Sequence, residues 1–329
     1  MDAKTISAAR RRDVGLGQPW CSRCGRDSRM VWKGSDVNGT GPVGGHIERD
    51  GFKIAYLDWG RGLRDIDTQP LVVLHPTGFC AGTFDPLAKR LGHRFHFVGV
   101  DLRGHGQSST ATDVDDLGND VLALDVLAVA DHLDLANFSV LGVSLGGGVG
   151  IEVAVASPGR VDALMLCEAI AIDPSTWNQH STTYEEGQHP LAVAARRRRP
   201  VWPDRETVID SYGSRQPLCL LEPEVLEAYV RWGFVDRSDG QVELACAPET
   251  EATFFGSWAR HGPAEAFENL IDVDSRSSVL AGTETYLEWR WFEAQADRLG
   301  VDLTVVEGSH FFLFEDLKRG ASLILEHLG

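Results

Sequence analysis

The sequence is poor in basic residues relative to acidic ones and lacks a long apolar run. It holds 31 Lys and Arg against 48 Asp and Glu, so its formal net charge is −17 at pH 7. A surface this acidic repels phosphate backbones, which excludes nucleic-acid binding for the chain as a whole. No apolar run approaches the roughly 18–20 residues of a membrane-spanning helix. We therefore expect neither a nucleic-acid nor a membrane partner.

Cysteine is also scarce, with six in 329 residues. Cys21 and Cys24 are close in sequence, whereas the other four are scattered. This usage is typical of a reducing compartment and excludes a disulfide framework, so we expect a cytoplasmic protein. A structural zinc site needs four ligands, and no second pair follows Cys24 at usable spacing. We therefore expect no metal site and no cofactor.

The chain divides into segments of different character. Residues 1–44 carry eight Lys and Arg against four Asp and show no helical or strand period, which predicts a disordered or loosely packed extension. Residues 45–170 and 260–329 alternate between strand and helix patterns and are expected to form one core. Residues 171–259 interrupt that alternation with many aromatic residues, helical segments and prolines, and predict a helical cap.

The expected core elements can be placed from hydrophobic periodicity. Apolar or alternating runs predict strands at residues 46–48, 53–57, 71–74, 95–100, 138–141, 163–167, 278–281 and 303–306. Apolar residues at helical spacing and an Ala/Val-rich run predict helices near 116–133, 146–156, 285–299 and 315–328. The sequence therefore predicts an α/β fold: a mostly parallel, doubly wound sheet with the cap inserted after the sixth strand.

The most informative motif is Gly142-Val143-Ser144-Leu145-Gly146. It lies between an apolar strand and a glycine-opened helix. A G-x-S-x-G turn in that position holds its serine in a strained conformation and exposes the hydroxyl above the sheet. Glycines two positions before and after the serine are needed because a Cβ there would clash. We interpret Ser144 as a nucleophile.

From about Gly45 onward the chain resembles the α/β-hydrolase family. The resemblance rests on His75-Pro76-Thr77-Gly78-Phe79 after the third strand, on residues 101–108 (DLRGHGQS) after the fourth, on the Ser144 motif and on Gly308-Ser309-His310-Phe311 near the end. It implies the family fold and its catalytic apparatus of serine, acid and histidine. It says much less about the substrate.

Ser144 needs a base, because a serine hydroxyl is a poor nucleophile at neutral pH. His310 is the candidate, since it follows the last expected strand and the family order places the histidine late. His75 and His105 lie in family loops and are expected to brace the backbone.

The acid has two main candidates. Most relatives carry an aspartate in a Gly-x-x-Asp turn after the strand that follows the cap, but Gly282-Thr283-Glu284-Thr285 has threonine at that position. The resemblance to some haloalkane dehalogenases implies an alternative place directly after the sixth strand, where this chain has Glu168. A carboxylate between apolar residues needs a partner, and an imidazole would supply one. We favour Glu168 and keep Glu284 as the alternative; Asp272 and Asp274 are further ones.

An oxyanion hole needs two backbone N–H groups aimed at one point. The resemblance implies those of Leu145, after the nucleophile, and Thr77, the second residue after His75. Pro76 has no N–H and cannot donate.

Four consecutive arginines, residues 196–199, lie in the expected cap. A run of like charge is usually a solvated helix face or helix end, and the proline at position 200 favours a helix end. Steering of acidic substrates is the alternative interpretation.

The residues and the resemblance together predict a serine hydrolase acting on a small or medium carboxylic ester or lactone. A carbon–carbon bond hydrolase with the same triad, or a binding protein with little turnover, are the alternatives. Dehalogenase and epoxide hydrolase chemistry is disfavoured, because those relatives use a carboxylate nucleophile where this chain has Ser144. The sequence leaves the oligomeric state open.

Overall fold

The structure, a computed structural model, describes residues 41–60, 68–111, 113–176, 189–258 and 262–329. Of the expected extension, residues 1–44, the first 40 residues lie outside the described ranges, and Cys21 and Cys24 are among them. Its last residues are described, and β1 begins at Val43, so the sheet includes two residues that the sequence analysis assigned to the extension.

Eight strands form one mostly parallel sheet in the order β1-β2-β4-β3-β5-β6-β10-β11. They span β1 Val43–Arg49, β2 Phe52–Asp58, β3 Gln69–Leu74, β4 Phe95–Val100, β5 Phe138–Val143, β6 Val161–Cys167, β10 Arg276–Gly282 and β11 Leu303–Val306. β2 pairs antiparallel with β1 and β4, and the other neighbours are parallel. Every expected strand is present, and the expected α/β sheet is confirmed.

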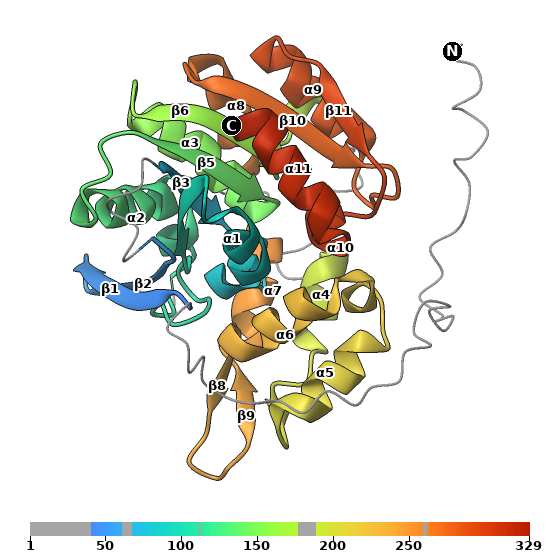
Figure 1. The fold of residues 1–329 in the computed structure, drawn as a ribbon. Helices are drawn as coiled ribbons and strands as arrows, with labels where there is room; N and C mark the ends of the chain where they lie inside the picture. Colours follow the sequence, from blue (N-terminus) through green and yellow to red (C-terminus); the bar gives the residue numbers. More distant parts are fainter. Residues whose placement is uncertain (1–40, 61–67, 112, 177–188, 259–261) are drawn as a thin grey trace, which may run out of the picture.

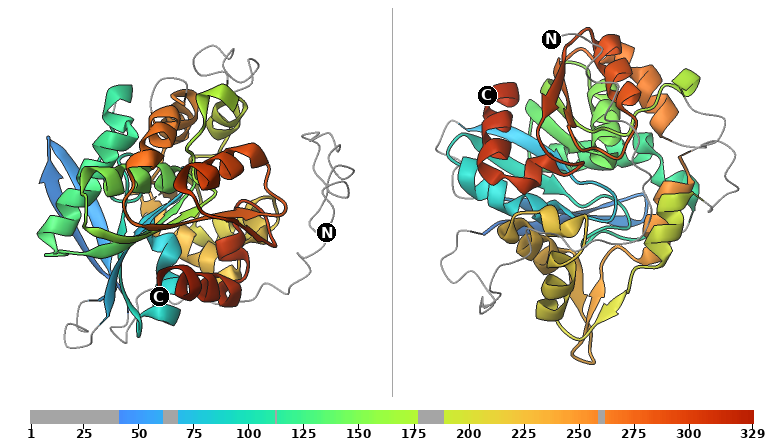
Figure 2. Two further views of the ribbon diagram at one scale, coloured as in Figure 1. Left: turned by 90° about the horizontal axis from the view of Figure 1, so that it is seen from above. Right: turned by 90° about the vertical axis from the view of Figure 1, so that its right-hand side faces the viewer.

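Helices cover both faces of this sheet (Figures 1 and 2). The residues of β3 show the division, because alternate side chains of a strand point to opposite faces. Val72 and Leu74 pack in the core formed with α2, α3, α8 and α9, whereas Leu71 and Val73 pack in the core formed with α1, α10 and α11. These helices span α1 Asp85–Leu91, α2 Asn119–His132, α3 Leu145–Ala156, α8 Pro263–Asn269, α9 Trp289–Leu299, α10 Phe312–Glu315 and α11 Leu317–Leu328.

Three expected helices have different bounds because side chains or backbone turns interrupt them. The helix expected from residue 116 begins at Asn119, after a separate 3₁₀ turn at Val114–Leu117. The helix expected over 315–328 is broken at Asp316, whose carboxylate accepts from the N–H of Arg319 and starts α11. The helix expected from residue 285 begins only at Trp289, because the Thr285 hydroxyl accepts from the N–H of Leu287.

The chain between β6 and β10 contributes a separate group of elements, which lies at one end of the main sheet in Figures 1 and 2. It contains α4 Pro190–Arg196, α5 Arg205–Gly213, α6 Pro223–Trp232 and α7 Pro248–Gly256, with a small antiparallel sheet of β7 Val201–Trp202, β9 Val242–Leu244 and β8 Phe234–Asp236. This sheet was not expected, since strands of two or three residues are too short to show a period.

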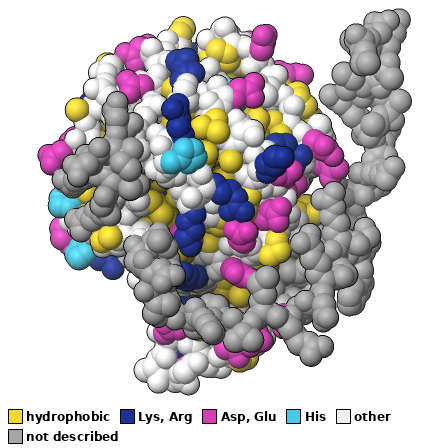
Figure 3. Space-filling model, in the orientation of Figure 1, with side chains coloured by type: hydrophobic (Ala, Val, Ile, Leu, Met, Phe, Trp, Pro, Cys, Tyr) yellow, Lys and Arg dark blue, Asp and Glu magenta, His cyan; other side chains and the backbone are white. Residues whose placement is uncertain are grey.

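The charges are spread over the surface in both signs. Lys and Arg side chains form a broken line down the face shown in Figure 3, and acidic side chains lie on both sides of it. Within the described ranges, no helix combines the length and hydrophobicity needed to cross a bilayer.

Candidate active site

Ser144 lies at the turn between β5 and α3, in a conformation that few residues other than glycine adopt. Its backbone angles are φ 56° and ψ −117°, and its carbonyl accepts from the N–H of Ile170 at 3.0 Å. Such strain persists only where the surroundings enforce it, and it is typical of functional sites. The turn places the serine side chain at the carboxyl end of the central strands.

Two glycines make this turn possible. A Cβ on Gly142 would lie 2.3 Å from the carbonyl oxygen of Gly146, and one on Gly146 would lie 2.2 Å from that of Leu74. Both distances are far below van der Waals contact with backbone that cannot move aside. The glycine spacing expected from the motif therefore has its physical cause in the close approach of α3 to β3 and β5.

Glu168 and His310 form a buried pair beside this turn. The Nδ1 of His310 and the Oε2 of Glu168 are 2.6 Å apart, and both side chains are almost fully buried. Glu168 directly follows β6, and His310 follows β11. Because the carboxyl ends of parallel strands meet at one edge of a sheet, all three side chains lie at the same edge as the end of β5.

The Glu168 carboxylate is fixed by two further donors. Its Oε1 accepts from the N–H of Gly282 at 2.7 Å, and its Oε2 accepts from the Thr285 hydroxyl at 2.6 Å. Thr285 occupies the position where the sequence analysis noted that relatives carry an aspartate. Thr285 had no role predicted from the sequence, although a hydroxyl at the usual position of the acid is a signal that could have indicated one.

In the described structure, the other acidic candidates make no hydrogen bond or ion pair with His310. Glu284 is exposed, although it is next to Thr285 in the chain. Asp272 and Asp274 precede β10, and Asp274 accepts from the N–H of Gly159, which precedes β6. That is the amino end of the strands, opposite to the edge where His310 lies. Among these four carboxylates, Glu168 is the one that contacts His310.

The two expected oxyanion donors, the N–H groups of Leu145 and Thr77, lie at the start of α3 and in the loop after β3. Leu145 is the first residue of α3, and a first-turn N–H has no partner within its helix. Thr77 lies in the loop after β3 and is 8% exposed. Within the described part of the chain, neither N–H donates a hydrogen bond to a protein group.

Two histidines hold the loop that carries Thr77. His75 accepts from the N–H of Leu102 through Nε2 and donates from Nδ1 to the Pro76 carbonyl at 2.9 Å. His105 accepts from the N–H of Gly78 at 3.0 Å and donates from Nδ1 to the Arg103 carbonyl. Each ring thus uses one nitrogen as acceptor and one as donor, which requires neutral imidazoles.

Burial enforces that neutrality. Desolvation lowers the pKa of His75 from its usual 6.5 to about 4, and it lowers the pKa of His105 well below the same value. The expected bracing role of both histidines follows from these bonds.

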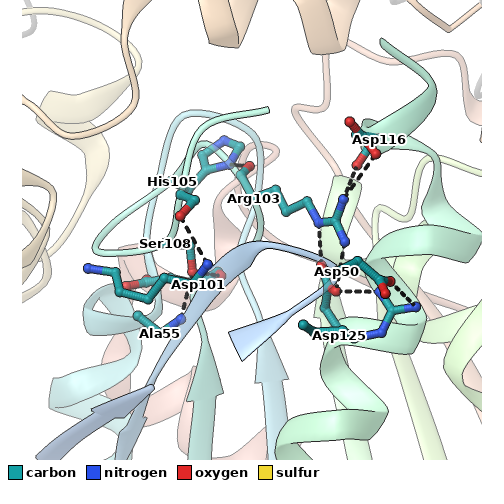
Figure 4. Close-up of polar contacts among 11 residues, drawn as sticks. Asp50, Ala55, Asp101, Arg103, His105, Ser108, Asp116 and Asp125 are labelled. Atoms are coloured by element: carbon teal, nitrogen blue, oxygen red, sulfur yellow. Dashed lines mark hydrogen bonds and ion pairs between the residues drawn. The ribbon is translucent and has the colours of Figure 1, made fainter. Parts of the chain in front are cut away.

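The loop after β4 is anchored by charged side chains (Figure 4). Arg103 is buried and donates from Nε and Nη2 to the two oxygens of Asp125, at 2.7 and 3.1 Å. Asp101 accepts from the N–H groups of Ala81 and Gln107, and the Ser108 hydroxyl donates to the Asp101 carbonyl. Desolvation raises the pKa of Asp101 to about 6. This loop thereby fixes the place of His105.

A small pocket, with room for about one water molecule and lined by both polar and apolar atoms, lies beside the Ser144 turn. One wall is the side chain of Leu145, and Ile170 forms another part of the lining. The pocket is lined by Leu117, Asn119, Leu145, Ile170, Phe254, Ser257, Trp258 and Pro263. Within the described ranges, no group of three or more His, Cys, Asp and Glu could hold a metal ion.

Comparison with known proteins supports the assignment of this fold. Residues 70–221 match the family model described as the α/β-hydrolase fold. Solved structures superpose over most of the chain, among them an E-2-(acetamidomethylene)succinate hydrolase with a TM-score of 0.70, 16% identity and coverage of 87% of this chain and 99% of that one.

The chain has the α/β-hydrolase fold. A second structure of this fold, an enol-lactonase from Burkholderia xenovorans, has a TM-score of 0.62 and 19% identity, and the match covers 86% of this chain and 99% of that one. At such identities the similarity concerns the fold alone.

Curated relatives of this α/β-hydrolase-fold protein match over shorter stretches. A non-heme chloroperoxidase from Streptomyces lividans is 37% identical over 123 residues, which cover 37% of this chain and 42% of that protein. A pimeloyl-[acyl-carrier protein] methyl ester esterase from Nitrosomonas europaea is 38% identical over 96 residues, covering 29% and 35%. The chain thus spans less than half the length of these relatives.

One of the four arginines at residues 196–199 does not lie at the solvated helix end that the sequence predicted. α4 ends at Arg196, so the expected helix end is confirmed. Arg198, however, turns inward and bonds to Glu251 and two tyrosines. No periodicity in the sequence distinguishes it from its neighbours.

Proposed function

We propose that the protein is a serine hydrolase that cleaves a small or medium carboxylic ester or lactone. Ser144 acts as nucleophile, His310 as general base and Glu168 as the carboxylate that orients the imidazole. The observation that carries the proposal is the 2.6 Å contact between His310 Nδ1 and Glu168, at the same sheet edge as the strained Ser144 turn.

The chemistry follows from the tautomer of His310. Because an ionised carboxylate can only accept, Nδ1 carries the proton and Nε2 has a free lone pair. Nε2 takes the Ser144 proton as the serine oxygen attacks the acyl carbon, and the oxyanion binds the N–H groups of Thr77 and Leu145. Collapse expels the alcohol, which takes the proton from His310. Water then attacks the acyl-enzyme and gives a proton to His310. Collapse of the second intermediate breaks the bond to the Ser144 oxygen, which takes that proton back from His310, and releases the acid.

The surroundings support an apolar substrate group. The side chains of Leu145, Ile170 and Phe254 lie beside the Ser144 turn, so an acyl group bound to Ser144 would meet apolar side chains there. The methyl ester esterase among the curated relatives supports the ester class. We assign residues 45–170 and 260–329 to the hydrolase core and 171–259 to a cap. The proposed chemistry needs no metal or cofactor, and we place it in the cytoplasm.

A fluorophosphonate probe tests the mechanism. We expect it to label the wild-type protein at Ser144 and to leave Ser144→Ala unlabelled, because the reagent reacts only with an activated serine. Mass spectrometry of the labelled peptide identifies the site. Absence of labelling, together with a ligand that raises the melting temperature, would instead support a binding protein on this fold.

A substrate panel tests the reaction class. We expect turnover of p-nitrophenyl esters of increasing chain length or of small lactones, with a preference for apolar acyl groups. A diketone belongs in the same panel, since carbon–carbon bond hydrolysis uses the same residues. Turnover of the diketone alone would replace the ester assignment while keeping Ser144 as nucleophile.

A further inference from the structure

The loop that carries Thr77 also contacts the segment between β6 and β10. The Tyr229 hydroxyl, on α6, is 3.0 Å from the carbonyl oxygen of Gly78, and Arg198 Nη2 is 2.7 Å from the same hydroxyl. Arginine has only donors, so the Tyr229 oxygen accepts from Arg198 and its single proton goes to Gly78. Burial raises the pKa of Tyr229 well above its usual range, which keeps that proton in place.

Arg198 is itself held from two other helices. Its Nη1 donates to Glu251 on α7, and its Nη2 also reaches the Tyr212 hydroxyl on α5 at 3.2 Å. The group fits closely over the loop, because a Cβ on Gly78 would lie 2.8 Å from Glu251 Cδ and 3.0 Å from Arg198 Nη1. Gly78 also has φ +78°, so glycine is favoured there for two reasons.

Peptide planarity connects this contact to the N–H of Thr77. The Gly78 carbonyl shares a rigid plane with the N–H of Phe79, which donates to the Pro76 carbonyl at 3.1 Å. The Pro76 carbonyl in turn shares a plane with the N–H of Thr77. A rotation of the Gly78 carbonyl therefore disturbs the bond that sets the direction of the Thr77 N–H.

The two neighbouring planes are held from the core side. The N–H of Gly78 donates to His105, and the Pro76 carbonyl accepts from His75. For the Gly78 carbonyl, the partner in the described structure is Tyr229. Of the three consecutive planes, this one depends on the segment between β6 and β10.

We infer that Tyr229, held by Arg198 and Glu251, is a positioning residue for the oxyanion hole. The segment between β6 and β10 is then part of the catalytic apparatus, because the direction of the Thr77 N–H depends on how that segment is seated. This inference rests on the proposed function.

The test compares Tyr229→Phe with Tyr212→Phe. Both changes remove one phenol oxygen that binds Arg198, but only the first removes a donor to the Thr77 loop. We expect kcat for a p-nitrophenyl ester to fall about tenfold in Tyr229→Phe, below the 10²–10³ that loss of a whole oxyanion donor costs. KM should stay within about twofold, because the lost interaction acts mainly in the transition state. Tyr212→Phe should change neither constant by more than about twofold.

Two further measurements separate positioning from stability. The rate of Ser144 phosphonylation, which also builds negative charge on an oxygen, should fall with kcat in Tyr229→Phe. Active-site titration expresses both rates per folded molecule. Equal kcat values in the two variants, or a loss confined to KM, would overturn the inference.

The same experiments distinguish failure of the proposed function from failure of the role inferred for Tyr229. If wild-type Ser144 is not phosphonylated, the serine hydrolase proposal itself is wrong. If wild type is phosphonylated but both variants react at its rate, only the role of Tyr229 is refuted. If Tyr229→Phe does not fold, Arg198→Lys replaces it; loss of the guanidinium fork should then lower kcat and leave KM unchanged, and an unchanged kcat refutes the role.

Discussion

Two regions of the molecule bury carboxylates against basic side chains, with opposite results. At the loop after β4, Asp125 of α2 binds the loop residue Arg103 and also Arg49, and the loop histidine His105 uses both ring nitrogens. At the strand ends, Glu168 holds the Nδ1 of His310, and no group of the described residues bonds its Nε2. Complete pairing makes the first region a brace, whereas the unused nitrogen leaves the second able to move a proton.

The largest expected effect lies at the strand ends. Glu168→Gln should lower kcat by about 10³–10⁴, because an amide can donate to Nδ1 and so favours the tautomer with the proton on Nε2. Steady-state kinetics with a p-nitrophenyl ester measures it. Glu284→Gln is the matched control: the side chain is exposed, and kcat should be unchanged. The reverse ranking would transfer the acid role to Glu284.

A substitution in the brace around Arg103 should lower the stability of the fold. Asp125→Ala removes the carboxylate that pairs two arginines and leaves the buried Arg103 with the long contacts of its Nη1 to Asp116, at 3.4 Å. We expect the free energy of unfolding to fall by about 3–5 kcal/mol, as when one partner of a buried ion pair is removed. Urea denaturation measures this loss. If kcat per folded molecule fell in Asp125→Ala as much as in Glu168→Gln, the region around Arg103 could not be described as structural and the region around His310 as catalytic.

A smaller effect should appear as pH dependence. The pKa of His75 is about 4 in the folded protein and about 6.5 in the unfolded chain, so the unfolded chain binds a proton at His75 more readily. Its stabilising contribution is complete above pH 6.5 and is lost as pH falls toward 4, by about 3 kcal/mol at 1.36 kcal/mol per unit.

His75→Gln should flatten this dependence. Glutamine also offers one acceptor for Leu102 and one donor for Pro76, yet it does not titrate. Denaturation at pH 7, 5.5 and 4 measures the slope in both proteins. An equal loss of stability on acidification in wild type and His75→Gln would show that this histidine is not the titrating group.

Much of the fold could be predicted because its pattern is local. The alternation of apolar strands with helices placed every core strand, and Asp50-Gly51, both with positive φ, form the expected hairpin turn. The errors lie where a single side-chain bond changes the backbone, as at Thr285 and Asp316. The α1 helix was also missed, since it spans only seven residues.

For the site, Ser144 and His310 could be proposed from motifs along the chain, because glycine spacing and strand ends are properties of neighbouring residues. Glu168 could be favoured over Glu284, but Glu284 had to be kept as the alternative, since the two differ in a contact with a residue 142 positions from Glu168. The geometry of that contact arises from β6 and β11 lying at one edge of the sheet.

The sequence by itself determined the strained serine turn. Its two glycines are required by backbone that lies close to them, at Gly146 within the motif and at Leu74 on β3. Only the tertiary structure decided which acid meets His310 and that Arg198, alone in its run, turns inward to hold Tyr229. The physical reason is that burial and pairing depend on groups from distant segments of the chain. Four identical arginines in one run therefore do not indicate which of them will be buried against such groups.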